Sequence, residues 1–75
     1  MDNDSNKQLL IKIGKNLREL RLQKGFSQEK LANELGIEIS QISRIERGVI
    51  NTSVTTLYAI CLVLKIDVSD LFKFD

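Results

Sequence analysis

One stretch of the sequence, residues 28–48, constrains the fold more than any other part of the chain. Apolar residues spaced three or four positions apart share one face of a helix. The stretch has two such pairs, Leu31 with Leu35 and Ile42 with Ile45. Between them, Gly36 can adopt the positive φ that a sharp turn after a helix requires. The stretch therefore predicts two short helices joined by a tight turn.

The second of these predicted helices has a face that the apolar pattern leaves outward. Its outward positions are Ile39, Ser40, Ser43, Arg44 and Arg47. Ala32 stands four residues before the turn glycine and is small enough to let another backbone come close. Two helices that cross at a steep angle require this spacing, so the stretch predicts a helix-turn-helix with its second helix free for recognition.

The flanking residues extend this pattern to a known family. Residues 17–21 and 24–32 resemble the first helix, and its junction into the second, of the lambdoid-repressor-like (XRE-type, Cro/C1-type) helix-turn-helix family. Residues 42–48 resemble the end of the family's recognition helix, and residues 51–72 its last two helices. The resemblance covers roughly residues 9–74 and is close to stand-alone controller and repressor proteins. The resemblance implies an all-α, compact five-helix lambda-repressor-like DNA-binding domain with the helix-turn-helix at helices 2 and 3.

Length and composition agree with one small helical domain. The 75 residues include no proline, and leucine and isoleucine far outnumber valine and the aromatic residues, which favours helices over a sheet. One cysteine and no histidine exclude an internal disulfide framework and any ordinary zinc site. Cys61 lies in an apolar run, so we expect a buried thiol rather than a redox group. We expect a flexible N-terminal tail at residues 1–6 and the helix-turn-helix DNA-binding domain at residues 7–75.

Targeting and charge patterns favour a cytoplasmic protein with few contacts to phosphate. The longest apolar run, residues 57–64, is far too short to span a bilayer, and no charged-then-apolar leader opens the chain. The net charge is only +1, but residues 7–25 hold six basic residues against one acidic residue. Such a basic helix face can equally be ordinary solvated surface. Affinity for nucleic acid must therefore rest on a few placed contacts.

The first helix is predicted from about Lys7 to Lys24. Apolar residues recur along it at steps of three and four, at Leu10, Ile13, Leu17 and Leu20. Gly25 ends this helix, and Ser27 is placed to cap the next one.

The last two helices are predicted from a serine and an aspartate. Ser53 is placed as the N-cap of a helix to about Leu64, and eight successive apolar residues indicate that this helix is central in the core. Lys65 stands where relatives often have glycine. If this residue is left-handed, the lysine lowers stability by up to about 1 kcal/mol relative to glycine. Asp67 caps a last short helix that reaches Phe72.

The resemblance also implies roles for single residues. It pairs Arg21 with Glu46, which ties the first helix to the end of the recognition helix; a solvent-exposed arginine is the alternative. It places base contacts on Ile39, Ser40 and Arg44, with Gln41 as a weaker candidate. It places contacts to DNA phosphate on Gln28, Ser43, Arg47, Asn51 and Thr52. Arginine can donate two hydrogen bonds to guanine, and isoleucine can pack on a thymine methyl group.

Two of these roles have ordinary alternatives, and one position departs from the family. Gln28 can simply start a helix, and an exposed isoleucine such as Ile39 is common on protein surfaces. Glu38 replaces the serine or threonine that relatives often have at this cap. It suits the helix dipole but repels phosphate.

A dimer is expected through the C-terminal part of the chain. The predicted interface residues are Tyr58, Leu62, Phe72 and Phe74, with Val63 beside them. One recognition helix covers only a few base pairs, so a two-fold pair on an inverted-repeat operator would double the contacts. The alternative is that the fourth helix is fully buried within one subunit.

The sequence thus predicts a DNA-binding transcriptional regulator, of repressor or restriction–modification controller type, that reads the major groove of duplex DNA as a homodimer. The chain has no pattern of catalytic residues, so we expect no enzyme activity, cofactor, metal or small-molecule ligand. The competing hypothesis is a protein-interaction module or antitoxin-type protein that binds a partner with the same helices. A domain cut from a larger regulator is a further alternative, against which the initial Met1 counts.

Overall fold

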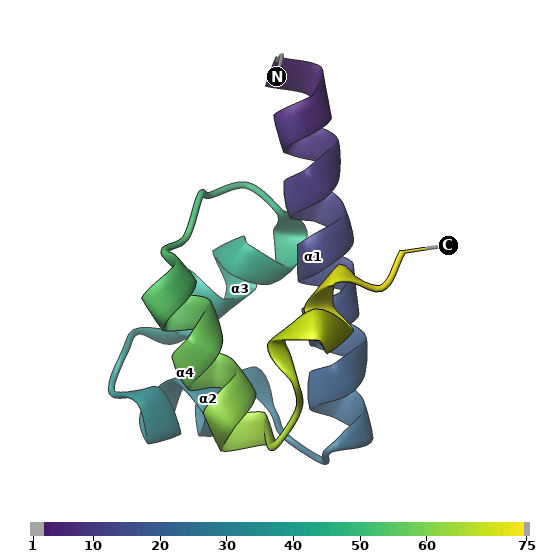
Figure 1. Cartoon of the computed structure of the whole chain (residues 1–75). Helices are drawn as coiled ribbons and strands as arrows, with labels where there is room; N and C mark the ends of the chain where they lie inside the picture. The colour runs from purple at the N-terminus through teal and green to yellow at the C-terminus, as the bar shows by residue number, and fades with distance from the viewer. Residues whose placement is uncertain (1–2, 75) are drawn as a thin grey trace.

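The computed structural model of the chain describes residues 3–74, which form four α-helices and one terminal 3-10 helix (Figure 1). The elements are α1 (Asn3–Gln23), α2 (Gln28–Leu35), α3 (Ile39–Arg47), α4 (Val54–Leu64) and η1 (Val68–Phe72). All regular elements within the described residues are helical, which confirms the all-α class. The expected fifth helix is present, but as a single 3-10 element rather than an α-helix.

The start of α1 differs from the expectation. The helix begins at Asn3, four residues before the predicted start at Lys7, so the predicted tail is helical from residue 3 onward. Residues 1–2 lie outside the described part. Asp4 stands in the first turn, where a negative side chain interacts favourably with the helix dipole. In Figure 1 the first turns of α1 extend beyond the other helices.

The turn between α2 and α3 forms as its residues predict. Gly36 has φ 70° and ψ 31°, the left-handed conformation, and its N–H donates to the Asn33 carbonyl at 3.2 Å. The next N–H, of Ile37, donates to the Ala32 carbonyl at 3.1 Å, which completes the C-terminal cap. At the other end of α2 the Ser27 hydroxyl accepts from the backbone N–H of Lys30 at 2.9 Å. Local hydrogen bonds therefore fix both ends of α2.

The core lies between the helices and is almost entirely aliphatic. Its buried residues are Ile13, Leu17, Leu31, Ala32, Ile42, Ile45, Leu57, Ile60, Cys61, Leu64 and Leu71. Only one face of α4 reaches this core, so the alternative that this helix is fully buried within one subunit is wrong. On the other face the side chains of Tyr58 and Leu62 are 55% and 60% exposed. Tyr58 and Leu62 are two of the residues predicted at the dimer interface, although the eight successive apolar residues carry no helical periodicity.

The C-terminal elements are held by side-chain caps. The Ser53 hydroxyl accepts from the backbone N–H of Thr56 at 3.1 Å. Lys65 ends α4 with φ 58° and ψ 47°, so the left-handed position is occupied by a residue that has a Cβ. Asp70 accepts from the backbone N–H of Asp67 at 3.0 Å.

Three further findings concern the described residues. None of the helices in residues 3–74 is long and apolar enough to cross a membrane. In the same range no group of three or more acidic, cysteine or histidine side chains is arranged to hold a metal ion. Cys61 is a free, buried thiol, as expected. Burial raises its pKa, and the carboxylates of Asp70 and Asp67 raise it further, so the thiol stays protonated at neutral pH.

Candidate nucleic-acid interface

The orientation of α3 is set by a close crossing with α1. A Cβ added at Gly14, in the middle of α1, would lie 2.4 Å from the Ile45 carbonyl oxygen and 2.5 Å from that of Glu46. A Cβ added at Gly48, just after α3, would lie 2.6 Å from the Cα of Ile11. No side chain fits at either place, so the two backbones are in direct contact. The last turn of α3 therefore rests on the backbone of α1.

Sequence reasoning missed this crossing, although a signal was present. Gly14 stands inside a predicted helix, where glycine costs about 1 kcal/mol relative to alanine. A glycine retained at such a cost usually has a packing reason. Its position beside Ile13 in the apolar stripe would have pointed to the buried side of the helix.

A buried ion pair fixes the same junction. Arg21 of α1 donates from Nε to Glu46 Oε2 at 2.6 Å and from Nη2 to Glu46 Oε1 at 3.1 Å. Its Nη1 donates to the Phe26 carbonyl at 2.6 Å, in the link between α1 and α2. Arg21 and Glu46 are 5% and 8% exposed. The structure thus contains the pair that the family resemblance implies, and one guanidinium joins α1, the α1–α2 link and α3.

Gln28 extends this network toward the surface. Its side chain donates from Nε2 to Glu46 Oε1 at 3.1 Å, so the glutamate accepts bonds from two residues. Gln28 is half-buried at the N-terminus of α2, where the outward backbone N–H groups and the helix dipole favour an anion. Every buried side-chain nitrogen and oxygen in the described residues has a hydrogen-bond partner. The first residue of α2 and the last turn of α3 are therefore held in one fixed arrangement.

The face of α3 that points away from the core carries the residues predicted to contact bases. Ile39, Ser40, Gln41 and Arg44 are all exposed. Ser40 and Arg44 are four positions apart, so they share one outward stripe. Ile39, at the leading end of the helix, is 46% exposed. This stripe offers a hydroxyl, a guanidinium and an apolar side chain to a ligand.

The residues predicted to contact phosphate surround this stripe. Arg47 is exposed, and its Nε donates to the Ser43 carbonyl at 3.4 Å. Ser43 and Thr52 are half-buried, whereas Asn51 is exposed in the loop between α3 and α4. Together with Gln28 they come from three separate parts of the chain. Gln28 lies at the N-terminal end of α2, Ser43 and Arg47 lie on α3, and Asn51 and Thr52 lie in the loop that follows α3.

The charge around α3 is mixed. Arg44 and Arg47 stand in its last turn, while Glu38 is its N-cap residue and makes no capping hydrogen bond with its side chain. An acidic cap suits the helix dipole but would meet an approaching phosphate unfavourably. Net attraction to an anion must therefore come from the two arginines and from the backbone N–H groups that begin α2.

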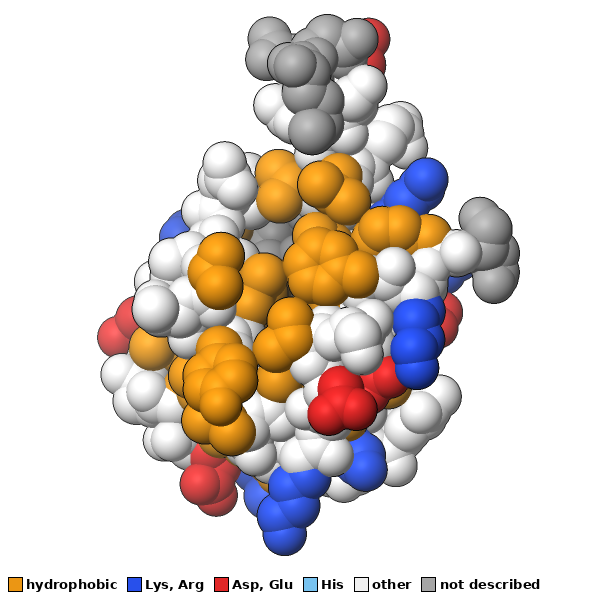
Figure 2. Space-filling model, in the orientation of Figure 1, with side chains coloured by type: hydrophobic (Ala, Val, Ile, Leu, Met, Phe, Trp, Pro, Cys, Tyr) orange, Lys and Arg blue, Asp and Glu red, His pale blue; other side chains and the backbone are white. Residues whose placement is uncertain are grey.

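A second surface is apolar and lies on α4 and η1. Four large side chains define this α4–η1 surface, with exposed fractions of 55% for Tyr58, 60% for Leu62, 44% for Phe72 and 38% for Phe74. Figure 2 shows hydrophobic side chains gathered over these elements and over the adjoining turns of α1. The largest exposed apolar patch of a small protein is often a binding site for another molecule. These are the residues expected at a dimer interface, and the structure leaves them open.

The arrangement of the helices can be compared with known families. The profile of the helix-turn-helix family matches residues 17–71, which is most of the chain. The chain belongs to the helix-turn-helix family. This finding confirms the resemblance seen in the sequence.

Members of the family that are similar to this chain include regulators and restriction–modification controllers. The control protein C.BamHI of Bacillus amyloliquefaciens is 40% identical over 63 residues, which cover 83% of this chain and 78% of that protein. The crystal structure of the restriction–modification controller protein C.AhdI from Aeromonas hydrophila has a TM-score of 0.80 and 41% identity, and covers 84% of this chain and 96% of that one. The controller protein C.Esp1396I, solved as a tetramer with its natural 35 base-pair operator, has a TM-score of 0.72 and 29% identity, with 87% and 96% covered.

Proposed function

We propose that this protein is a sequence-specific regulator of transcription that reads the major groove of duplex DNA with α3. The observation that carries this proposal is the exposed stripe of α3, held at a fixed angle by the crossing at Gly14 and by the buried pair of Arg21 and Glu46. A recognition helix needs such a rigid support because base contacts depend on its depth and angle in the groove. The similarity to controller proteins supports the repressor or controller type.

In this proposal the stripe on α3 reads bases. Arg44 donates two hydrogen bonds to the O6 and N7 atoms of a guanine, Ser40 bonds to the neighbouring base, and Ile39 packs on a thymine methyl group. Gln41 contacts an adjacent base edge.

The surrounding residues bind the DNA backbone. Phosphate contacts come from Gln28, Ser43, Arg47, Asn51 and Thr52. Gln28 uses one amide N–H for Glu46 and has a second that can donate to phosphate, so its DNA contact is prepared by the buried pair. These contacts set the register of the protein on the duplex but carry no sequence information.

The DNA-bound form in this proposal is a homodimer joined through the α4–η1 surface. Two copies related by a two-fold axis present two recognition helices to an inverted-repeat operator, with half-site centres roughly 10 base pairs apart. C.Esp1396I, which assembles as a tetramer on its operator, is a relative in which several copies bind one DNA site. The protein acts where the genome is, which in a bacterium is the cytoplasm, and it regulates rather than catalyses.

Selection from random duplexes tests base reading. Arg44→Ala should cost about 1–3 kcal/mol of binding free energy on the preferred site and relax the preference at one base pair. Arg47→Ala is the matched control, because it removes a phosphate contact and should weaken all sequences alike. If Arg44→Ala selects the same sequences as the unchanged protein, the assignment of Arg44 is wrong. A protein that retains no duplex above background would favour the protein-interaction or antitoxin-type hypothesis instead.

A further inference from the structure

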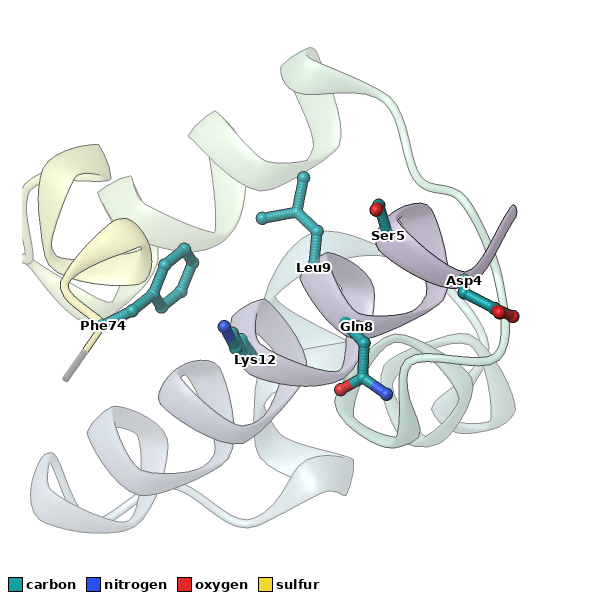
Figure 3. A pocket seen from close by; sticks show the side chains of 6 residues that line it. All are labelled: Asp4, Ser5, Gln8, Leu9, Lys12 and Phe74. Carbon is teal, nitrogen blue, oxygen red and sulfur yellow. The ribbon is translucent and has the colours of Figure 1, made fainter. Parts of the chain in front are cut away.

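A groove beside Phe74 joins the apolar α4–η1 surface to the first turns of α1. It is lined by Asp4, Ser5, Gln8, Leu9, Lys12 and Phe74. In Figure 3, Leu9 and Phe74 border the same space, with Lys12 between them. The Lys12 ammonium nitrogen lies 5.7 Å from the centre of the Phe74 ring. The aromatic end of the chain is thus one wall of the groove, and α1 is the other.

The C-terminal segment is fixed against α1 rather than left free. The Asn16 side chain donates from Nδ2 to the Leu71 carbonyl at 2.9 Å and to the Lys73 carbonyl at 3.1 Å. The rings of Phe72 and Phe74 stand 6.3 Å apart. These contacts place Phe74 at the junction of the groove and the α4–η1 surface, so the two adjoin through an aromatic side chain.

The α4–η1 surface alone is too small for a stable dimer. A large aromatic side chain has about 150–250 Å² to bury, and the four side chains of this surface are roughly half exposed, so together they offer on the order of 400 Å². A specific interface buries about 800 Å² on each partner. About half of the required area must therefore come from neighbouring surface.

The groove is one neighbouring surface that continues the apolar character; the other is α4 itself, where Val54, four positions before Tyr58, is 78% exposed. On the η1 side the surface ends in charge, because Lys73 donates to Asp70 at 2.8 Å there. Toward α1 it continues through Phe74 to Leu9, which is half-buried and packs on the core. Asp4 and Lys12 supply one group of each sign on the rim of the groove. A surface that meets itself across a two-fold axis can then avoid like charges.

We propose that this groove is occupied by a second copy of the chain, so that the first turns of α1 form the outer half of the dimer interface. The proposal rests on the homodimer of the proposed function and adds the part of the chain that completes it. The family match begins at residue 17, so these turns are an addition to the segment that defines the family. Their helical start at Asn3 extends the molecule along the side where the partner sits.

Sedimentation velocity of the full chain at micromolar concentrations tests this proposal. Leu9→Glu should raise the dimer dissociation constant at least tenfold, because a carboxylate would be buried at the interface. Leu22→Glu is the matched control, since Leu22 lies on the same helix with 51% exposure and away from the groove, and it should leave the constant unchanged. Gln8→Arg is a second groove variant at an exposed position, and it should weaken the dimer severalfold without affecting the core.

The outcomes separate this proposal from the proposed function. A wild-type dimer that Gln8→Arg and Leu9→Glu leave intact would overturn the role of the groove, while the α4–η1 dimer and DNA binding would stand. A wild-type protein that remains monomeric both free and on its selected DNA would overturn the homodimer and the groove together. Thermal unfolding of each variant identifies any loss of folding, and Gln8→Arg then decides the result alone.

Discussion

The crossing of α1 and α3 and the α4–η1 surface are built in opposite ways. At the crossing, backbones touch at Gly14 and Gly48, and every buried side-chain nitrogen and oxygen of the described residues has a hydrogen-bond partner. On the α4–η1 surface, large apolar side chains remain 38–60% exposed within the described residues. At the crossing there is no space for an added side chain, whereas the α4–η1 surface has exposed apolar side chains that can contact another molecule.

This difference shows how the small domain divides its tasks. The crossing sets the angle of α3, so it must be rigid, and an ion pair contributes geometry even where desolvation offsets much of its attraction. The α4–η1 surface contributes little to the fold of one subunit and is available to a partner. Variants in the first region should therefore change stability, and variants in the second should change association.

The largest expected effect comes from breaking the buried pair on one side. Arg21→Ala or Glu46→Gln should lower the free energy of unfolding by on the order of 3–5 kcal/mol, because the remaining group is left buried without its partner. Replacing both residues together should recover part of this loss. Urea titration measures all three variants. Single variants with wild-type stability would contradict the burial of the pair.

A smaller loss is expected at the crossing itself. Gly14→Ala should lower the free energy of unfolding by about 1–3 kcal/mol, because its Cβ would overlap the Ile45 and Glu46 carbonyl oxygens. Helix propensity alone predicts the reverse, a gain of about 1 kcal/mol. Lys15→Ala, at the exposed neighbouring position, is the control and should stay within about 0.5 kcal/mol of wild type. A stabilised Gly14→Ala protein would show that the helices are further apart than described.

The smallest effect is a gain, at the end of α4. Lys65 is left-handed with φ 58°, so Lys65→Gly should raise the free energy of unfolding by about 1 kcal/mol. Lys65→Ala keeps the Cβ and removes only the charged chain, and it should remain close to wild type. Thermal unfolding of the pair separates the backbone effect from the loss of the lysine. Equal stability of Lys65→Gly and Lys65→Ala would contradict the predicted backbone effect.

Local signals allowed much of the fold to be predicted from sequence. Gly36, Ser27, Ser53 and Asp67 each act on residues within four positions, so the turn and the helix starts followed directly. The pair of Arg21 and Glu46 spans 25 positions and came from the family resemblance, not from spacing.

The features that could not be predicted depend on contacts between helices, or on stretches of sequence that have no helical periodicity. The close approach at Gly14 exists only because α3 lies there, and no local rule contains it. The contact of Gln28 with Glu46 likewise joins two helices. In α4 an unbroken apolar run carries no periodicity, so Tyr58 and Leu62 could be named as interface residues while full burial of the helix in one subunit stayed open as the alternative. The early start of α1 was missed because Asp4, Ser5 and Asn6 are all residues that favour a cap.

The central claim is that one side of the molecule reads DNA while the apolar side joins two copies. Hydroxyl-radical footprinting on a selected duplex tests it most directly, with wild type compared with Leu62→Glu, whose change lies on the exposed face of α4. We predict two protected half-sites with centres roughly 10 base pairs apart for the wild type, and weak protection for Leu62→Glu at the same concentration. A single protected half-site for the wild type, unchanged in Leu62→Glu, would contradict the account.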